Sequence, residues 1–480
     1  MKKTFLCRLT ALLLAAALML TFVGCGDKTD NPSDVSSVSS GKEIDKNSAD
    51  KDKTTSDASS DTVSDTSSAD NSYTDNSYSN NYTDGSQSTS DISSDKGGSD
   101  YQIFGSLGTE QSSQPGLYVE DGVVKLGGKV FYGIGTNYYD AYLRQLLNPL
   151  DGDIEEGLKT IASYNLPYIR ARFSPWGDEG MEYFWTDREE YYRSTDRFVA
   201  LCEKYNIGII ATLVWTTNAY TSEGQEFAEF IEDPYSDGYQ KMLVYMKSII
   251  TRYKNSPAIW GWEVGNEYNL GCDVQDTTLT ADALSKHYSI ITPLIRAWDG
   301  TNRIISTGNS QNRGASWHLW QEGNWTVDTL EQLKIVTKLW TTPEISVNSI
   351  HVYNRTQALD GKTGVSVSDY LAAEVALSKE LGTPLFIGEY CDDEIGKAET
   401  ENDTEENSLA KFDVLHEAIV NNDIQLACLW IYGRGKDDYI NPSEYNKHML
   451  AAAQKANKNY VAQGKQNTSS YWSSMTAVVK

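Results

Sequence analysis

The stretch Ala258–Glu267 reads AIWGWEVGNE, and it is soon followed by Thr280–Trp298, which reads TADALSKHYSIITPLIRAW. The first stretch is a nearly continuous apolar run rich in aromatic and β-branched residues, which is typical of a strand buried on both faces. The second repeats apolar residues at spacings of three and four, which indicates an amphipathic helix. A buried strand followed by such a helix is one unit of a parallel sheet, so the fold is predicted to be α/β.

The same unit recurs along the rest of the chain. We expect strands at 130–137, 166–173, 207–215, 258–267, 302–309, 347–354, 384–391 and 424–433. We expect a helix after each of them, at 153–165, 189–206, 239–254, 280–298, 327–340, 369–382, 406–420 and 443–457. Eight such units predict a (β/α)8 TIM barrel. A doubly wound open sheet is the alternative, and it is disfavoured because no strand-to-helix turn carries a GxGxxG phosphate loop.

Two short alternating runs precede the first barrel strand. They lie within LYVEDGVVKLGGKVF and surround Asp-Gly and Gly-Gly turns, which predicts a hairpin. We expect this hairpin to close the bottom of the barrel.

The N-terminus reads MKKTFLCRLTALLLAAALMLTFVGC, with two lysines, an apolar run and a small Gly24 before Cys25. The pattern is typical of an export signal, because the apolar run is too short to span a membrane comfortably. Its end resembles a bacterial lipobox, in which the Cys becomes the lipidated first residue. We expect a signal peptide over 1–24, a lipid anchor at Cys25 and a location on the outer face of a bacterial membrane. A signal peptide cut elsewhere, with Cys25 incidental, is the alternative.

Residues 25–115 are dominated by Ser, Asp, Thr and Asn and have almost no aliphatic side chains. Such a segment cannot bury enough apolar surface to offset the entropy lost on ordering, so we expect a disordered tether. The remaining residues, 116–480, are expected to form the catalytic domain.

The charge and the cysteines exclude several classes of function. The formal net charge of −26 argues against a nucleic-acid partner, because affinity for phosphates rests largely on Lys and Arg. The cysteines of the expected domain show no CxxC spacing, so no zinc site is expected. Cys272 and Cys391 both follow strand ends, and either a disulfide between them or two buried thiols is compatible with the sequence.

Polar, acidic and aromatic residues gather at the carboxyl ends of the expected strands, where barrel enzymes place their chemistry. They are Asn137, Tyr138, Arg170, Arg172, Trp215, Asn266, Glu267, His351, Tyr353, Glu389 and Trp430. Arg170 and Arg172 share a strand face, and Arg170 is the preferred partner for an acid. Two facing acids can hold one proton at neutral pH, which glycoside hydrolysis requires. One carboxylate attacks the anomeric carbon while the other acid protonates the leaving oxygen.

Four stretches carry a resemblance to a known group. SPAIWGWEVGNE, SIHVY, FIGEY and ACLW resemble the signatures of strands four, six, seven and eight in retaining glycoside hydrolases of clan A. Within that clan the chain is most similar to glycoside hydrolase family 5, the cellulase and mannanase family, from Leu117 to the C-terminal helix. The resemblance implies that Glu267 is the acid/base and Glu389 the nucleophile. It also implies that Asn266 hydrogen-bonds the 2-hydroxyl of the sugar.

The resemblance implies further contacts around the −1 subsite, where the sugar is attacked. His351 and Tyr353 would hydrogen-bond there, with Tyr353 touching the nucleophile. Arg170 would keep Glu389 ionised, and Trp430 would stack under the sugar. Asn137, Tyr138 and Trp215 are further candidates for substrate binding from their strand ends. Many family members carry a His where this chain has Trp215.

We therefore expect a retaining endo-type β-glycoside hydrolase that cleaves a β-1,4-linked polysaccharide, a glucan or a mannan, by double displacement. The stretch YKNSPAIWGWEVGNE resembles mannanases more than cellulases. No cofactor and no metal are expected, and the chain is expected to be a monomer whose partners are the polysaccharide and, through its anchor, a membrane. The alternatives are an inactive surface lipoprotein that binds polysaccharide, and a transglycosylase.

Overall fold

The computed structural model describes residues 114–150, 152–175, 178–222, 224–273, 279–354, 357–392, 405–432 and 443–476. Within them, eight parallel strands form one sheet in the order β8-β7-β6-β5-β4-β13-β12-β9. Their bounds are β4 (Gly133–Asn137), β5 (Tyr168–Arg172), β6 (Gly208–Thr212), β7 (Ile259–Glu263), β8 (Ile304–Ser306), β9 (Asn348–Tyr353), β12 (Leu385–Cys391) and β13 (Leu426–Leu429). The backbone N–H of Ser346 donates to Ile305 O at 2.9 Å and joins the two ends of the sheet. The (β/α)8 prediction is confirmed, and the open-sheet alternative is wrong.

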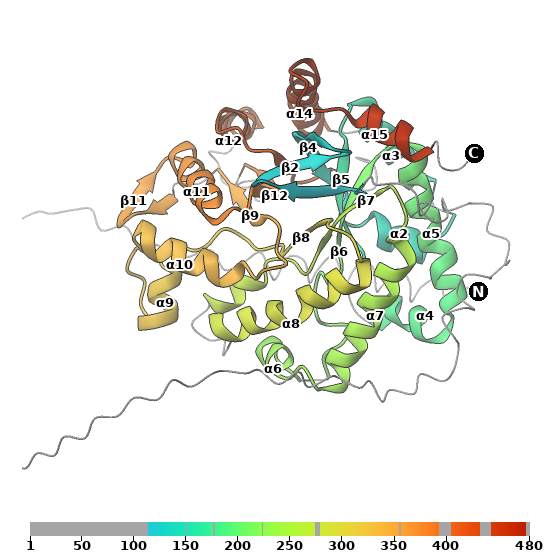
Figure 1. Ribbon diagram of the computed structural model, residues 1–480, viewed down its shortest axis with the longest axis horizontal. Coiled ribbons are helices and arrows are strands. Elements are labelled where there is room, and N and C mark those ends of the chain that lie inside the picture. The colour runs from blue at the N-terminus through green and yellow to red at the C-terminus, as the bar shows by residue number, and fades with distance from the viewer. Residues whose placement is uncertain are drawn as a thin grey trace, which may run out of the picture. The chain divides into compact units, whose positions relative to one another are not determined.

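Eight helices follow the strands in turn and cover the outside of the barrel (Figure 1). They are α3 (Asp153–Ser163), α5 (Arg188–Lys204), α7 (Asp237–Tyr253), α8 (Ala281–Asp299), α10 (Leu330–Trp340), α11 (Val367–Leu381), α12 (Glu405–Asn421) and α14 (Glu444–Ala462). Several begin at a side-chain cap. Ser236 and Thr280 accept backbone N–H groups at the starts of α7 and α8, which satisfies donors that the helix itself cannot.

Smaller elements lie mainly in the connections between strands and helices, and the sequence did not predict them. They are α2 (Ala141–Leu147), α4 (Asp178–Thr186), α6 (Phe227–Glu232), η1 (Tyr268–Cys272), α9 (Ser316–Glu322), β10 (Gln357–Leu359), β11 (Lys362–Val365) and α15 (Thr468–Thr476). All but α15 connect the carboxyl end of a strand to the next helix. They therefore belong to the loops that surround a barrel active site.

The N-terminal strands form a small antiparallel sheet of β1 (Leu117–Glu120), β2 (Val123–Leu126) and β3 (Lys129–Val130). Gln425, directly before β13, accepts from the backbone N–H of Val124 at 2.9 Å. Phe131 packs edge-on against Trp260 at the start of β7, with ring centroids 5.5 Å apart. The predicted hairpin, extended by a third strand, thus covers the amino ends of the barrel strands.

The expected leader, anchor and nearly all of the tether fall in residues 1–113, outside the described residues. None of the four cysteines of the described part, Cys202, Cys272, Cys391 and Cys428, forms a disulfide, so Cys272 and Cys391 are not bridged. Among the described helices, none combines the length and the apolar character needed to cross a membrane.

Candidate active site

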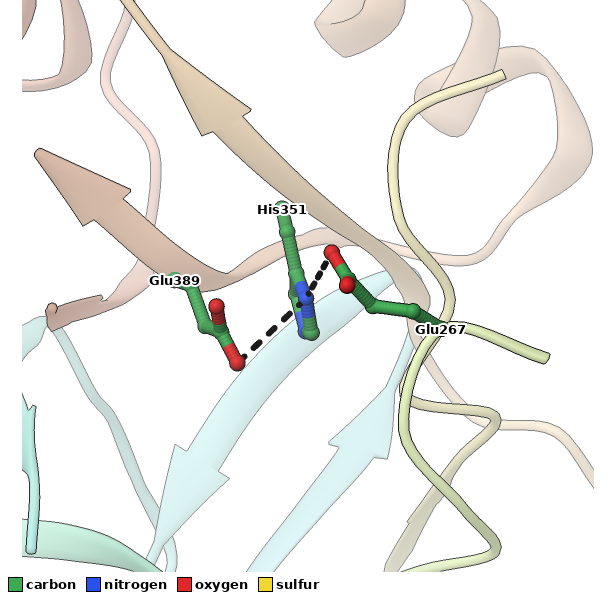
Figure 2. A group of neighbouring side chains, drawn as sticks. All are labelled: Glu267, His351 and Glu389. Carbon is green, nitrogen blue, oxygen red and sulfur yellow. Dashed lines mark hydrogen bonds and ion pairs between the residues drawn. The ribbon is translucent and has the colours of Figure 1, made fainter. Parts of the chain in front are cut away.

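Two carboxyl groups face one imidazole at the carboxyl end of the barrel. Glu267 follows β7, Glu389 lies in β12, and His351 of β9 lies between them (Figure 2). His351 Nδ1 is 3.0 Å from an oxygen of Glu267 and 3.5 Å from an oxygen of Glu389. One side-chain ligand atom from each of the three residues lies within 4.8 Å of the other two. Both acids can therefore reach the same atom of a bound molecule.

The backbone at Glu267 is locally strained. Its φ of 54° is left-handed, which is uncommon for a residue other than glycine. The backbone N–H of Glu267 donates to Gly308 O at 2.8 Å, which holds this conformation after β7 has ended. Strain of this kind persists where the surroundings over-determine it, which is common at functional sites.

Gly388 of β12 leaves room for the His351 ring, because glycine has no side chain. The β9–β12 register shifts between Ile387 and Glu389, at Gly388. A Cβ atom on Gly388 would lie 2.7 Å from His351 Nε2, closer than real contacts allow. Nε2 is buried and has no hydrogen-bond partner, whereas Nδ1 faces two carboxylates, so the geometry places the imidazole proton on Nδ1.

Glu389 is the more enclosed of the two acids. Its side chain is 4% exposed, compared with 28% for Glu267. Arg170 donates to one of its oxygens at 2.8 Å, and the Tyr353 hydroxyl donates to the other at 2.7 Å. Glu389 is therefore fixed at the floor of the site, while Glu267 stands closer to solvent.

Arg170 connects most of the predicted polar residues. Its terminal nitrogens donate to Asn137 Oδ1 at 3.0 Å and to Asn266 Oδ1 at 2.8 Å, in addition to Glu389. Asn137 in turn donates through Nδ2 to Gly388 O at 2.9 Å. Asn137 is fully buried and thus braces the arginine and β12, so the structure gives it no surface for the substrate contact that the sequence predicted.

The choice between the two arginines is decided by these contacts. Arg170 binds Glu389, whereas the Arg172 guanidinium lies 6.0 Å from the ring centroid of Tyr139. Arg172 is fully buried, and desolvation lowers its pKa to about 9. Arg170 is therefore the arginine of the acid pair.

The two acids have shifted pKa values. Desolvation raises the pKa of Glu389 above its ordinary value, and the charge of Glu267 adds to the increase, against the opposing effects of His351 and Arg170. Desolvation is the largest single effect on Glu267 as well, but the hydrogen bond and charge interaction with His351, a hydrogen bond with Ser310 and the charge of Arg170 together outweigh it and lower the pKa of Glu267. Such a pair titrates as a unit and holds one proton over a range of pH.

Three aromatic rings form a wall beside the acids. The rings of Trp215 and Trp430 are nearly parallel, with centroids 6.3 Å apart, and Tyr139 packs against both at 5.8 and 5.6 Å. The guanidinium of Arg170 lies 4.7 Å from the Trp215 ring centroid, as a cation–π contact. The wall therefore adjoins the residues that hold Glu389.

Tyr138 does not belong to this wall, and its prediction as a substrate-binding residue is wrong. It is fully buried on the outer side of β4, where it packs against Tyr432 and fills the space left by Gly157 of α3. The sequence analysis missed Tyr139. Because side chains alternate along a strand, Tyr139 rather than Tyr138 shares the side of Asn137, so the period-two rule could have found it.

A metal ion is conceivable between Glu267, His351 and Glu389, whose atoms are suitably close. The same oxygen of Glu389 that would ligate the ion already accepts from the Arg170 guanidinium. A divalent cation there would be repelled by this fixed positive charge. The donor set fits proton and covalent chemistry at the carboxyls better than metal binding.

The sequence also missed Glu263, the last residue of β7. It is fully buried, and it accepts hydrogen bonds from Arg170, Thr212 and Ser306. A Glu inside an otherwise apolar strand was the signal that could have found it, because a buried acid needs partners.

The chain is similar in sequence to known glycoside hydrolases. Residues 136–432 match the sequence model of the family described as Cellulase (glycosyl hydrolase family 5). A probable mannan endo-1,4-beta-mannosidase F of Aspergillus flavus is 26% identical over 306 residues, which are 56% of this chain and 60% of that protein. A mannan endo-1,4-beta-mannosidase A of Aspergillus aculeatus is 22% identical over 289 residues, 55% of this chain and 71% of that protein.

The chain thus spans 60% of the length of the A. flavus relative. Among solved structures, the endo-1,4-beta-mannanase from Rhizomucor miehei superposes with a TM-score of 0.52 at 16% identity, covering 72% of this chain and 99% of that chain. At this identity the likeness shows the fold.

Proposed function

Because the chain belongs to glycosyl hydrolase family 5, we propose that it is a retaining endo-type hydrolase of β-1,4-linked polysaccharide, with mannan as its substrate. The observation that carries the proposal is the acid pair. The ligand atoms of Glu267 and Glu389 lie within 4.8 Å, close to the separation of about 5–5.5 Å that double displacement uses and shorter than inversion requires.

In the first step, the carboxylate of Glu389 attacks the anomeric carbon and Glu267 protonates the glycosidic oxygen, so that the bond to the leaving sugar breaks. The positions of the two residues support these roles. Glu389 is fixed by Arg170 and Tyr353 at the floor, whereas Glu267 is more exposed and can reach a leaving group. Asn266 accepts from Arg170 through Oδ1, which leaves its amide nitrogen as a donor for the 2-hydroxyl.

The substrate-free pKa shifts run opposite to these roles, since Glu389 is the acid with the raised pKa. A proton therefore passes to Glu267 when the sugar enters. His351 Nδ1 lies 3.0 Å from Glu267 and 3.5 Å from Glu389, so its N–H can turn from Glu267, once that acid is protonated, to the newly ionised Glu389. The transfer of the proton from Glu389 to Glu267 leaves Glu389 ionised and Glu267 protonated, as the attack requires.

In the second step, Glu267 takes a proton from water, and the hydroxide attacks the anomeric carbon and releases Glu389. Two inversions at the same carbon retain its configuration. Of the three rings in the wall, Trp430 and Tyr139 are partly exposed and supply apolar faces against which a sugar ring can stack, whereas Trp215 is 5% exposed and packs against them.

The experiment is to incubate the full chain with mannan, glucomannan, carboxymethylcellulose and xylan, and to follow the products by early-time NMR. We expect mannan or glucomannan to be cleaved to mixed oligosaccharides whose new reducing ends are first β. Initial α products would contradict the retaining mechanism. Activity on xylan alone would contradict the proposal that mannan is the substrate. Glu389→Gln serves as the inactive control.

We further propose that Cys25 is lipidated and holds the enzyme on the outer face of a bacterial membrane. The supporting observation is the sequence FVGC after a short apolar run, followed by a long polar segment rich in Ser and Asp. An enzyme that acts on a polymer outside the cell gains from a tether that keeps its products near the surface.

A further inference from the structure

Glu263 is a buried carboxylate that the proposed reaction does not use. Its side chain is 0% exposed, and it lies beneath the guanidinium of Arg170. Arg170 Nε donates to Glu263 Oε1 at 2.7 Å. The cost of burying a charged carboxylate is large unless it is paired and hydrogen-bonded, so its surroundings are informative.

Both neighbours of β7 in the sheet, β6 and β8, contact Glu263. In the β6–β7 and β7–β8 registers, Thr212 and Ser306 are its direct partners on either side. Both hydroxyls donate to its carboxylate, Thr212 to Oε1 at 2.7 Å and Ser306 to Oε2 at 3.0 Å. The carboxylate is thus clamped from both neighbouring strands and has little freedom to move.

Glu263 is connected to the reacting acid Glu389 through Arg170, which hydrogen-bonds both carboxylates. With Nε engaged by Glu263, the two terminal nitrogens of Arg170 face Glu389, Asn137 and Asn266. Arg170 is therefore shared between two carboxylates, one in the reaction and one outside it. Glu263 both orients the guanidinium and offsets part of its positive charge.

We propose that Glu263 is a positioning residue of the reaction, which fixes Arg170 toward Glu389 and Asn266 and limits how strongly the charge of Arg170 stabilises the Glu389 carboxylate. This inference rests on the proposed function for its kinetic consequences. Too strong a stabilisation would make Glu389 a poorer nucleophile, and a guanidinium free to rotate would lose its bond to Asn266.

The test is Glu263→Gln, which keeps the shape and removes the charge. Without the second carboxylate, Arg170 favours ionised Glu389 more strongly, so the pKa of Glu389 falls and the basic limb of kcat/KM, where the single proton of the acid pair is lost, moves to lower pH by about one unit. We expect kcat/KM at its optimum to fall by about 10-fold or more, because one charged hydrogen bond that orients Arg170 is weakened. KM should change much less than kcat.

The matched control is Glu374→Gln. Glu374 on α11 is also fully buried and hydrogen-bonded, by the Tyr370 hydroxyl at 2.7 Å, but it lies outside the acid pair and its contacts. This control should leave the basic limb in place. The variant Glu263→Asp keeps the charge but shortens the reach, so its basic limb should match that of the parent while kcat/KM is reduced.

A readout without substrate separates this inference from the proposed function. The carboxyl carbon of Glu389, labelled with carbon-13 and assigned by its loss in Glu389→Gln, is titrated by NMR in the full chain. A lower pKa in Glu263→Gln supports the inference even if mannan is not the substrate. An unchanged titration, or an unchanged kcat/KM in a folded Glu263→Gln protein, overturns it. If Glu263→Gln does not fold, parental kcat/KM in Glu263→Asp overturns it, and a reduced value with an unmoved basic limb supports it.

Discussion

At the scale of single residues, the chemistry depends on two glutamates in different surroundings. Glu389 receives hydrogen bonds from Arg170 and Tyr353 and is almost entirely enclosed, while Glu267 is partly open and receives one from His351. The same functional group can therefore serve as nucleophile in one place and as acid/base in the other.

The two roles predict different kinetic behaviour when each glutamate is substituted. Glu389→Gln should lose nearly all activity with any substrate, because no glycosyl intermediate can form. Glu267→Ala should form the intermediate from an aryl glycoside with an acidic phenol, because that leaving group needs no proton, and then stall. Pre-steady-state kinetics should show a burst with Glu267→Ala, and azide should increase its turnover. A burst with Glu389→Gln instead would reverse the assignment.

The pH dependence follows from the raised pKa of Glu389. The active pair holds one proton, which Glu389 carries before the sugar enters, so kcat/KM should fall as the pH rises through a pKa above the ordinary Glu value of about 4.3 and this proton is lost. The Tyr353 hydroxyl favours the ionised form of Glu389, so Tyr353→Phe should raise this pKa further and move the basic limb to higher pH. The measurement is kcat/KM from pH 3 to 8, a range of about five units that brackets the expected limb.

A matched hydroxyl provides the control for this profile. Tyr370 also donates to a buried glutamate, Glu374, at 2.7 Å, but it lies on α11 outside the site. Tyr370→Phe should leave the basic limb where it is. A limb that moves equally in both variants would show a general effect on the protein and contradict the assigned role of Tyr353.

At the scale of elements, the site depends on how β9 and β12 are paired. The register shift at Gly388 turns Glu389 toward His351, and the missing side chain makes room for the imidazole. Local irregularities of this kind often re-aim side chains next to active sites. The pairing of β9 with β12 therefore sets the positions of His351 and Glu389 as well as stabilising the barrel.

Gly388→Ala should displace His351, because the new Cβ would meet its ring atoms at 2.7–2.8 Å. We expect kcat/KM to fall by about 100-fold, as a shift of about 1 Å in a reacting group can cause. Gly152→Ala is the control, since a Cβ there meets nothing within 4 Å. Equal kinetics for the two variants, measured on the same substrate with both proteins folded, would contradict this account of β12.

At the scale of the whole molecule, the proposed leader over 1–24 and the polar segment over 25–115 precede the barrel domain in the sequence. If Cys25 is the anchor, Cys25→Ser should move the protein from the membrane fraction to the medium or the soluble fraction. Cys7→Ser changes the other leader cysteine and should leave the protein with the membrane. The measurement is fractionation of cells followed by immunoblotting. If Cys25→Ser stays in the membrane fraction, Cys25 is not the anchor.

The sequence alone determined the barrel and the identity of the acid pair. Buried strands and amphipathic helices are encoded by local periodicity, so all eight strands could be placed to within a few residues. Glu267 and Glu389 stand in short contiguous patterns at strand ends, which identify them without knowledge of their neighbours. The small elements of the connecting loops carry no such periodicity, and they were missed.

Only the tertiary structure decided which residues serve the pair. The sequence favoured Arg170 over Arg172 without excluding the second, and the difference between them is set by Glu263 and Glu389, which are 93 and 219 residues away from Arg170. Tyr138 and Tyr139 likewise differ only in the side of β4 that they occupy. Hydrogen bonding and packing between distant strands depend on how the barrel closes, and local sequence does not specify these contacts.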